Sequence, residues 1–170
     1  VYTSQQGGTR FREKVKAEGG RYQFPYLVDP NTGVAMYESA EIAQYLFREY
    51  GTGQVPWFLR QRAFAVSTSM LASGFRPGRG RHVVPSRKPE ELLELYSYEG
   101  SPFCRIAREA LCELELPHHL HNVPRKSPDR SGFVSLSGKM QVPYLIDPNT
   151  GARMFESGEI RQYLYDTYAV

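Results

Sequence analysis

The chain has 170 residues, of which 41% are apolar and 13% aromatic, enough for one large folded domain or two small ones and too many for a disordered chain. Its 21 basic and 18 acidic side chains give a net charge of +3, which is too weak to indicate binding of nucleic acid. The presence of only two cysteines, Cys104 and Cys112, excludes the class of small secreted proteins that several disulfides hold together, and it favours a reducing compartment.

The first predicted element is a β-hairpin that starts at Pro25. A short apolar strand leads into a Pro-Asn-Thr-Gly turn at residues 30–33, in which proline presets φ and glycine takes the left-handed position, and a second strand returns antiparallel. Ser39 then stands where a helix N-cap belongs, and apolar residues recur at helical spacing from Ile42 onward. We therefore expect a helix directly after the hairpin.

A basic segment follows in the middle of the chain. Its cationic residues are Arg76, Arg79, Arg81, Arg87 and Lys88. One interpretation is a solvated linker, and the other is a surface for an anionic lipid or an acidic partner. The preceding stretch, Ala63 to Phe75, offers one helix but falls short of the roughly 20 apolar residues that a membrane span needs.

The next predicted elements are a strand at Leu92–Tyr98, a helix at Ser101–Leu114 and a strand at His118–Val123. An apolar stripe along the helix indicates that it packs on a sheet. Both cysteines fall in this helix, about 12 Å apart along its axis, so they cannot form a disulfide with each other. Adjacent His118 and His119 point to opposite faces of their strand and have no suitably spaced fourth ligand, so no metal site is predicted.

The sequence also contains an internal repeat. Residues 25–33, PYLVDPNTG, recur as PYLIDPNTG at residues 143–151, and the match continues without a gap through a second strand and into a helix. We therefore expect a second hairpin and a helix that opens at Ser157, again as an N-cap. The second half then has the order β-α-β, a less regular α stretch and β-β-α, which is typical of an α/β fold.

Three motifs in this order resemble the thioredoxin superfamily, specifically the N-terminal domain shared by glutathione transferases and glutaredoxins. They are Ser101-Pro102-Phe103-Cys104, Val142-Pro143-Tyr144 and Glu156-Ser157. The repeat is similar to a two-repeat family of plants and algae that is usually targeted to plastids. The resemblance implies two tandem thioredoxin-like units, each with a mixed four-stranded sheet and flanking helices. The units would span residues 1–51 and 92–170, with a helical and basic linker at 52–91. The resemblance also implies that the protein is located in a plastid or otherwise in the cytoplasm.

The resemblance assigns a catalytic position to Ser101 and a redox position to Cys104. A serine hydroxyl at a helix N-terminus can hydrogen-bond the thiolate of glutathione and lower the thiol pKa, whereas the alternative for Ser101 is a plain N-cap. Cys104 matches the second cysteine of a motif whose first cysteine has been lost. A buried structural role and a redox role are its two alternatives.

The other expected site residues bind glutathione. Pro143 resembles the family's cis-proline, and Val142 would offer its backbone to the cysteinyl part of the ligand; the alternative is a trans proline at the start of an edge strand. Glu156 and Ser157 resemble the pair that holds the γ-glutamyl end. In the family, two further positions often provide partners for the glycyl carboxylate, and in this sequence they are Lys139 and Gln141.

Two departures from the family limit the expected activity. The opening strand and helix of the first copy would lie before Val1, so either the chain is a processed fragment or these elements were never present; in the second case we expect an open sheet edge that a protein partner could cover. Glutathione transferases build the electrophile pocket from an all-helical domain that follows this fold, and we do not expect such a domain within residues 1–170. We therefore expect a protein that binds glutathione or a related thiol, with weak or vestigial transferase or redox activity. The alternative is a noncatalytic subunit of a larger complex, such as one at a plastid membrane.

Overall fold

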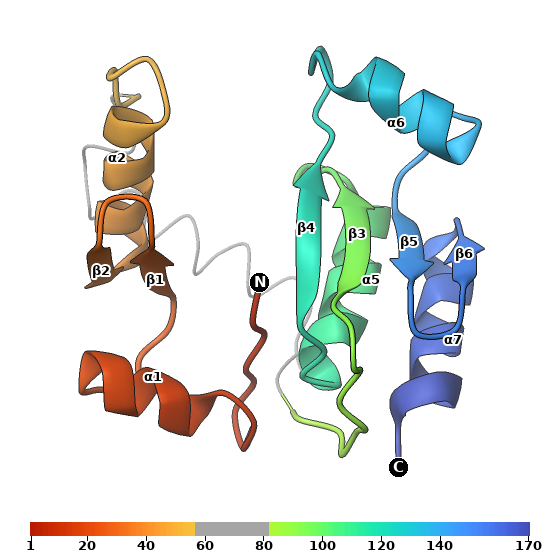
Figure 1. Ribbon diagram of the computed structural model, residues 1–170, viewed down its shortest axis with the longest axis horizontal. Coiled ribbons are helices and arrows are strands. Elements are labelled where there is room, and N and C mark those ends of the chain that lie inside the picture. Colours follow the sequence, from red (N-terminus) through yellow and green to blue (C-terminus); the bar gives the residue numbers. More distant parts are fainter. Residues whose placement is uncertain (57–81) are drawn as a thin grey trace. The chain divides into compact units, whose positions relative to one another are not determined.

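The computed structural model describes residues 1–56 and 82–170 (Figure 1). The chain divides into a C-terminal unit, formed by residues 1–11 and 79–170, and an N-terminal unit, formed by residues 12–78. The helix expected between 63 and 75 lies outside the described residues, as do Arg76, Arg79 and Arg81 of the basic segment. No helix in the described ranges is long and apolar enough to cross a membrane.

The C-terminal unit contains a mixed four-stranded sheet in the order β4-β3-β5-β6. β3 (Leu93–Ser97) runs parallel to β4 (His118–Asn122) and antiparallel to β5 (Tyr144–Asp147). β6 (Ala152–Met154) completes the hairpin with β5. The strands predicted from the sequence are confirmed, and this mixed sheet is the one expected for a thioredoxin-like fold.

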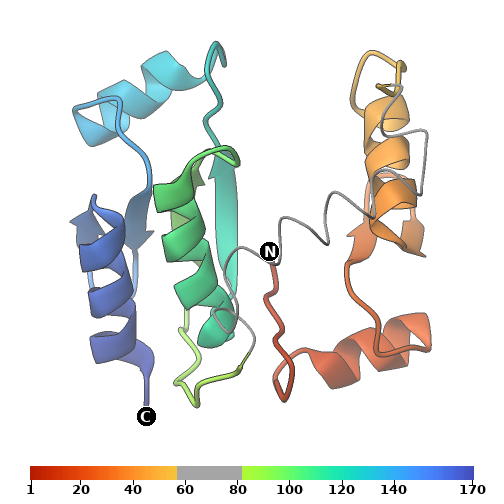
Figure 2. The same cartoon turned by 180° about the vertical axis from the view of Figure 1, so that it is seen from behind.

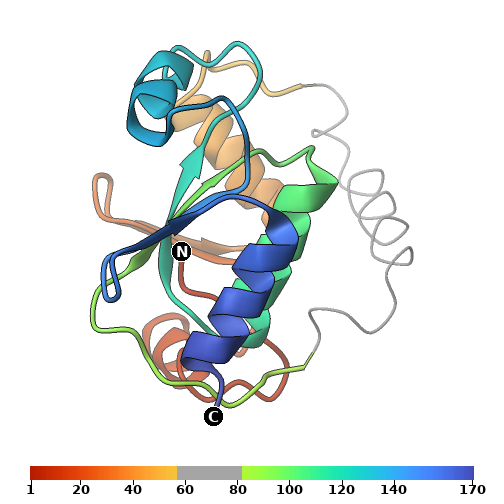
Figure 3. The same ribbon diagram turned by 90° about the vertical axis from the view of Figure 1, so that its right-hand side faces the viewer.

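Helices cover both faces of this sheet, as Figures 2 and 3 show. α5 (Pro102–Glu113) and α7 (Ser157–Tyr168) lie side by side on one face, and α6 (Arg130–Ser137) lies on the other. The apolar stripe of α5 is buried as predicted, because it packs on β3 and α7. The main core of this layer contains Leu93, Leu95, Ala107, Ala110, Leu111, Leu145, Ile160 and Leu164.

The N-terminal unit contains α1 (Arg12–Gly19), β1 (Tyr26–Asp29), β2 (Val34–Tyr37) and α2 (Ser39–Glu49). β1 and β2 form the predicted hairpin, a two-stranded antiparallel sheet separate from the four-stranded one. α1 was not predicted, because none of its residues is buried and its sequence shows no apolar period. Its bounds lie 118 positions before those of α6, which is the offset of the sequence repeat.

The starts of α2 and α7 differ from the prediction by one residue. Their N-caps are Glu38 and Glu156, whereas Ser39 and Ser157 are the first helical residues. Both glutamates have a positive φ, 70° for Glu38 and 63° for Glu156. The chain therefore turns from hairpin to helix at the glutamate, so the expectation that the serines are N-caps is wrong.

Residues 1–11 pack within the C-terminal unit, although the boundaries expected from the sequence place them with the first repeat. Val1 exchanges two backbone hydrogen bonds with His118, at 2.7 and 3.0 Å. The Thr3 hydroxyl lies 3.2 Å from the carbonyl oxygen of Leu111 and 3.3 Å from that of Leu116. The start of the chain is thus attached to the end of α5 and the start of β4.

Candidate functional site

The three motifs expected to form the site lie at one end of the four-stranded sheet. Ser101 follows β3, Val142 comes shortly before β5, and Glu156 comes shortly after β6. Because β3 and β5 are antiparallel, with Tyr96 opposite Tyr144, the end of β3 lies beside the start of β5. β6 ends beside the same part of β5, so the strand register brings the motifs to a common end of the sheet (Figure 1).

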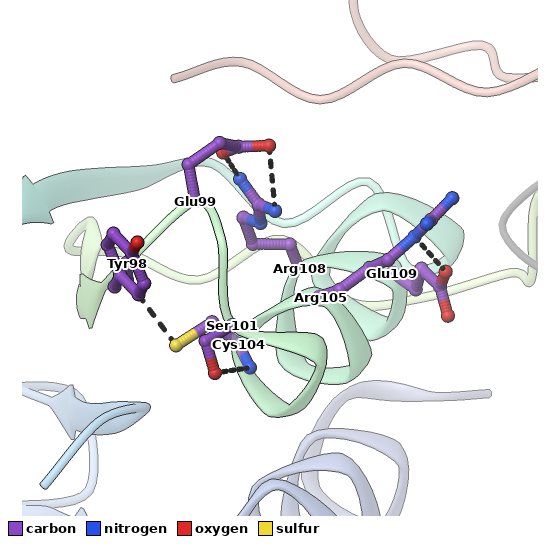
Figure 4. A network of polar contacts seen from close by, with 7 residues as sticks. All are labelled: Tyr98, Glu99, Ser101, Cys104, Arg105, Arg108 and Glu109. Carbon is purple, nitrogen blue, oxygen red and sulfur yellow. Dashed lines mark hydrogen bonds and ion pairs between the residues drawn. The ribbon is translucent and has the colours of Figure 1, made fainter. Parts of the chain in front are cut away.

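Ser101 is the N-cap of α5, as one of its two interpretations predicted. Its Oγ accepts the backbone N–H of Cys104 at 3.3 Å (Figure 4). A hydroxyl that accepts in this way still has its own proton to donate. The capping role of Ser101 therefore leaves it able to donate a hydrogen bond to a ligand thiolate.

Cys104 is fully buried, and its Sγ accepts the backbone N–H of Tyr98 at 3.4 Å (Figure 4). A disulfide substrate can reach this sulfur only if the first turn of α5 opens. Cys112, near the end of α5, is partly buried, and burial raises the pKa of its thiol. These surroundings favour the structural interpretation of Cys104.

The two arginines in the first turns of α5 are paired with carboxylates. Arg108 forms an ion pair with Glu99, and Arg105 Nε lies 3.2 Å from Glu109 Oε1 (Figure 4). Since these guanidinium groups already face carboxylates, the positive potential at this end of α5 comes mainly from the free backbone N–H groups of the helix N-terminus.

Val142 and Pro143 form the second part of the site. Their peptide bond is cis, as is the equivalent bond between Phe24 and Pro25. Pro143 is buried and Val142 is half-buried. Within the described residues, the backbone N–H and C=O of Val142 have no hydrogen-bond partner. An extended ligand could therefore pair with both groups.

A side-chain hydrogen bond links this segment to the start of α7. Gln141 Nε2 donates to Glu156 Oε1, and the equivalent Gln23 Nε2 donates to Glu38 Oε1 at 2.7 Å. Lys139 places its Nζ 4.3 Å from the centre of the Phe155 ring. The residues expected to bind the two ends of glutathione thus lie next to each other around Glu156, and Ser157 beside it is buried.

A row of aromatic rings, not predicted from the sequence, crosses the sheet face that α6 covers. Tyr96 on β3 stacks on His121 of β4, and its ring centre lies 6.1 Å from that of Tyr144 on β5. The ring centre of Tyr144 lies 4.4 Å from that of Phe155. A cavity of about 650 Å³ opens beside Tyr96 and His121. The sequence signal that could have predicted this row is the recurrence of ring-bearing residues two positions apart in the strand segments, such as Tyr96 and Tyr98.

No group of three or more histidine, cysteine, aspartate or glutamate residues in the described ranges is arranged to hold a metal ion. At this end of the sheet the structure presents hydroxyl, amide, carboxylate and ammonium groups together with the N-termini of α5 and α7. Such a set suits a small anionic ligand that also carries an amino group.

Comparison with known proteins relates most of the chain to one family. A family model described as the glutathione S-transferase N-terminal domain matches residues 2–54 and 95–169. A curated relative, the glutathione S-transferase-like protein tpcF of Aspergillus fumigatus, is 36% identical over 58 residues. That match covers 34% of this chain and 26% of the relative, so it spans about a quarter of the relative's length.

Proposed function

The chain belongs to the glutathione S-transferase N-terminal domain family, and on this basis we propose that its C-terminal unit binds glutathione or a closely related thiol at Ser101, Val142 and Glu156. The observation that carries the proposal is the unpaired backbone of Val142, which is half-buried at the end of the sheet where α5 and α7 begin. The extended cysteinyl part of glutathione would pair with this N–H and C=O as an added strand does.

Ser101 would act on the thiol of the bound ligand. Its hydroxyl donates to the sulfur while its Oγ continues to accept the N–H of Cys104. The N-terminus of α5 favours the negatively charged thiolate over the thiol. Ser101 would thereby lower the pKa of the glutathione thiol without forming a covalent bond to it.

The two ends of the ligand would be held by the groups around α7. The γ-glutamyl carboxylate suits the first N–H groups of α7 and the Ser157 hydroxyl, and the γ-glutamyl amino group suits the Glu156 carboxylate. The glycyl carboxylate suits the Lys139 ammonium. Gln141 already donates to Glu156 and would keep that carboxylate in position.

This arrangement supports binding and thiol activation more directly than complete catalysis. A serine cannot form the mixed disulfide that glutaredoxin chemistry requires. We propose weak or vestigial transferase activity, and a noncatalytic subunit is the alternative if the site does not bind the thiol.

Calorimetric titration with reduced glutathione tests the proposal. We expect a dissociation constant in the micromolar to millimolar range, roughly −8 to −4 kcal/mol. Ser157→Ala should weaken binding at least about tenfold, since it removes one hydrogen bond to a charged group. The matched control is Ser39→Ala, the equivalent change in the first repeat, which should leave the affinity unchanged.

Two results would contradict the proposal. One is the absence of heat on titration together with unchanged amide chemical shifts at Val142 and Ser157. The other is an equal loss of affinity in Ser39→Ala and Ser157→Ala, since the C-terminal unit would then not be the specific site.

A further inference from the structure

The cavity between β3, β4 and α6 shares none of its lining residues with the proposed glutathione site. Its volume of about 650 Å³ falls in the range of pockets that hold small organic ligands. Aromatic side chains in its lining are Tyr96, His121 and Phe133, and polar ones are Asn122, Asp129 and Ser131. Such a combination of flat rings and a few polar groups is typical of a small-molecule site.

The rings of this cavity form a layered set. Tyr96 stacks on His121 with ring centres 4.3 Å apart and an interplanar angle of 13°. It also stacks on Phe133, with ring centres 5.1 Å apart and an angle of 30°. Because the strands and α6 fix these rings, they offer a preformed surface to a planar ligand.

The cavity has one carboxylate in its lining, and the positive charge of Arg153 on β6 also acts on the Tyr96 hydroxyl. Asp129 is the only acidic or basic residue in the lining besides His121. Glu94 lies outside the lining but near it, with its Oε2 3.4 Å from His121 Nε2 and 3.2 Å from the Tyr96 hydroxyl.

The basic residues near Asp129 in the sequence, Arg125, Lys126 and Arg130, do not line the cavity. Arg130 donates through Nη1 to the Pro124 carbonyl at 3.3 Å. Arg125 and Lys126 are exposed. A cation therefore gains from the Asp129 carboxylate and from the aromatic rings of the lining.

We infer that this cavity binds a planar aromatic cation, with its ring packed beside the stacked Tyr96 and Phe133 rings and its positive charge toward Asp129. Asn122 and Ser131 accept hydrogen bonds from the amino groups of such a ligand. The site is additional to the proposed glutathione site and does not depend on it.

Gly132 gives a way to close the cavity without damaging the fold. It lies on α6 in the lining, and a Cβ added there would meet no atom within 4 Å. A larger side chain at this position would occupy cavity space, and replacing glycine also favours the helix. Ser135 is exposed on the same helix and does not line the cavity, which makes it the matched control.

The test is a fluorescence titration of the whole chain with 9-aminoacridine, a planar tricyclic cation at pH 7, beside the planar anion 9-anthracenecarboxylate. We expect the cation to bind at least tenfold more tightly than the anion. Gly132→Leu should weaken cation binding at least tenfold, whereas Ser135→Leu should leave it unchanged. Asp129→Asn should weaken it at least threefold and narrow the difference between the two probes.

The inference is overturned if 9-aminoacridine does not bind, or if the anion binds as tightly. It is also overturned if Gly132→Leu, shown to be folded by circular dichroism, binds the cation as the unchanged chain does. Saturating glutathione should leave cation binding unaffected, because the two sites share no residues. If glutathione displaces the probe, the probe binds in the glutathione site and the inference is wrong. Loss of glutathione binding alone would refute the proposed function and leave this site standing.

Discussion

Ser101 occupies the position where a cysteine would make this site a disulfide reductase. Its hydroxyl can donate to a thiolate, but it cannot attack a disulfide. Neither cysteine replaces it, since Cys104 is fully buried and burial raises the pKa of Cys112. We therefore expect no dithiol oxidoreductase activity in this chain.

Ser101→Cys should introduce such activity. The new sulfur would lie at the N-terminus of α5, where the helix dipole lowers a thiol pKa, and Cys104 one turn away could resolve a mixed disulfide once the turn opens. We expect at least a tenfold gain in glutathione-dependent reduction of hydroxyethyl disulfide, and no gain from Cys112→Ala. Activity of the unchanged chain that disappears in Cys104→Ala would contradict the structural role of Cys104.

His118 makes stability depend on pH. It is 2% exposed, and burial lowers the pKa of its imidazole from 6.5 to about 4. Between these values the unfolded chain binds a proton that the folded chain does not, so stability is complete above about pH 6.5 and declines as the pH falls toward 4. This loss should reach about 3 kcal/mol, measured by urea unfolding at several pH values.

Substitutions of the adjacent histidines provide the control for this pH dependence. His118→Gln should flatten the decline between pH 6.5 and 4, whereas His119→Gln, at an exposed position of the same strand, should retain it. An equally steep decline in His118→Gln would show that another group causes it.

At the scale of elements, each hairpin is linked to the segment that follows it by hydrogen bonds from two tyrosines to one aspartate. Tyr163 and Tyr168 of α7 each donate to Asp147 Oδ2 at 2.6 Å. In the N-terminal unit, Tyr45 and Tyr50 donate to Asp29 Oδ2 at 2.5 and 2.6 Å. Burial alone would raise the pKa of Asp147, but the hydrogen bonds from Tyr163, Tyr168 and Asn149 outweigh it and hold the pKa below its usual value.

Tyr168→Phe should therefore destabilise the C-terminal unit. It removes one hydrogen bond from a fully buried carboxylate, which costs about 1.5–3 kcal/mol, and the resulting rise in the Asp147 pKa should move acid unfolding to higher pH. Amide hydrogen exchange of α7 and β5 measures the effect. Tyr50→Phe, the equivalent change, should leave exchange in the C-terminal unit unaltered, and accelerated exchange there would contradict the assignment of one network to each unit.

Elements with a strong local pattern were predicted well from the sequence. The Pro-Asn-Thr-Gly turns and the apolar stripe of α5 specify the hairpins and the helix without reference to distant residues. α1 escaped prediction because it buries no side chain. The positive φ of Glu156 also escaped, since this backbone region is uncommon for residues other than glycine.

At the scale of the whole molecule, the C-terminal unit is built from both ends of the described chain. Arg10 donates through Nη2 to the Ser86 carbonyl at 2.6 Å, and through Nη1 to the carbonyls of Leu114 at 3.4 Å and Glu115 at 2.8 Å. The 3%-exposed Glu115 carboxylate accepts the backbone N–H groups of Thr9 and Arg10. These bonds join segments that share no sequence pattern, so the membership of residues 1–11 could not be predicted.

Arg10→Ala should loosen this attachment and lower the free energy of unfolding of the C-terminal unit by about 2 kcal/mol, because three carbonyl groups lose a charged donor. Urea unfolding followed by the near-ultraviolet signal of the tyrosines measures the change. Arg21→Ala removes the same charge from an exposed position of the N-terminal unit and should have little effect on that transition. Since Arg10 contacts the end of α5 and not its start at Ser101, glutathione affinity should be the same in both variants. Equal stability of Arg10→Ala and Arg21→Ala would mean that residues 1–11 are a loose terminus, whereas a loss of glutathione affinity in Arg10→Ala alone would mean that the attachment also positions the ligand site.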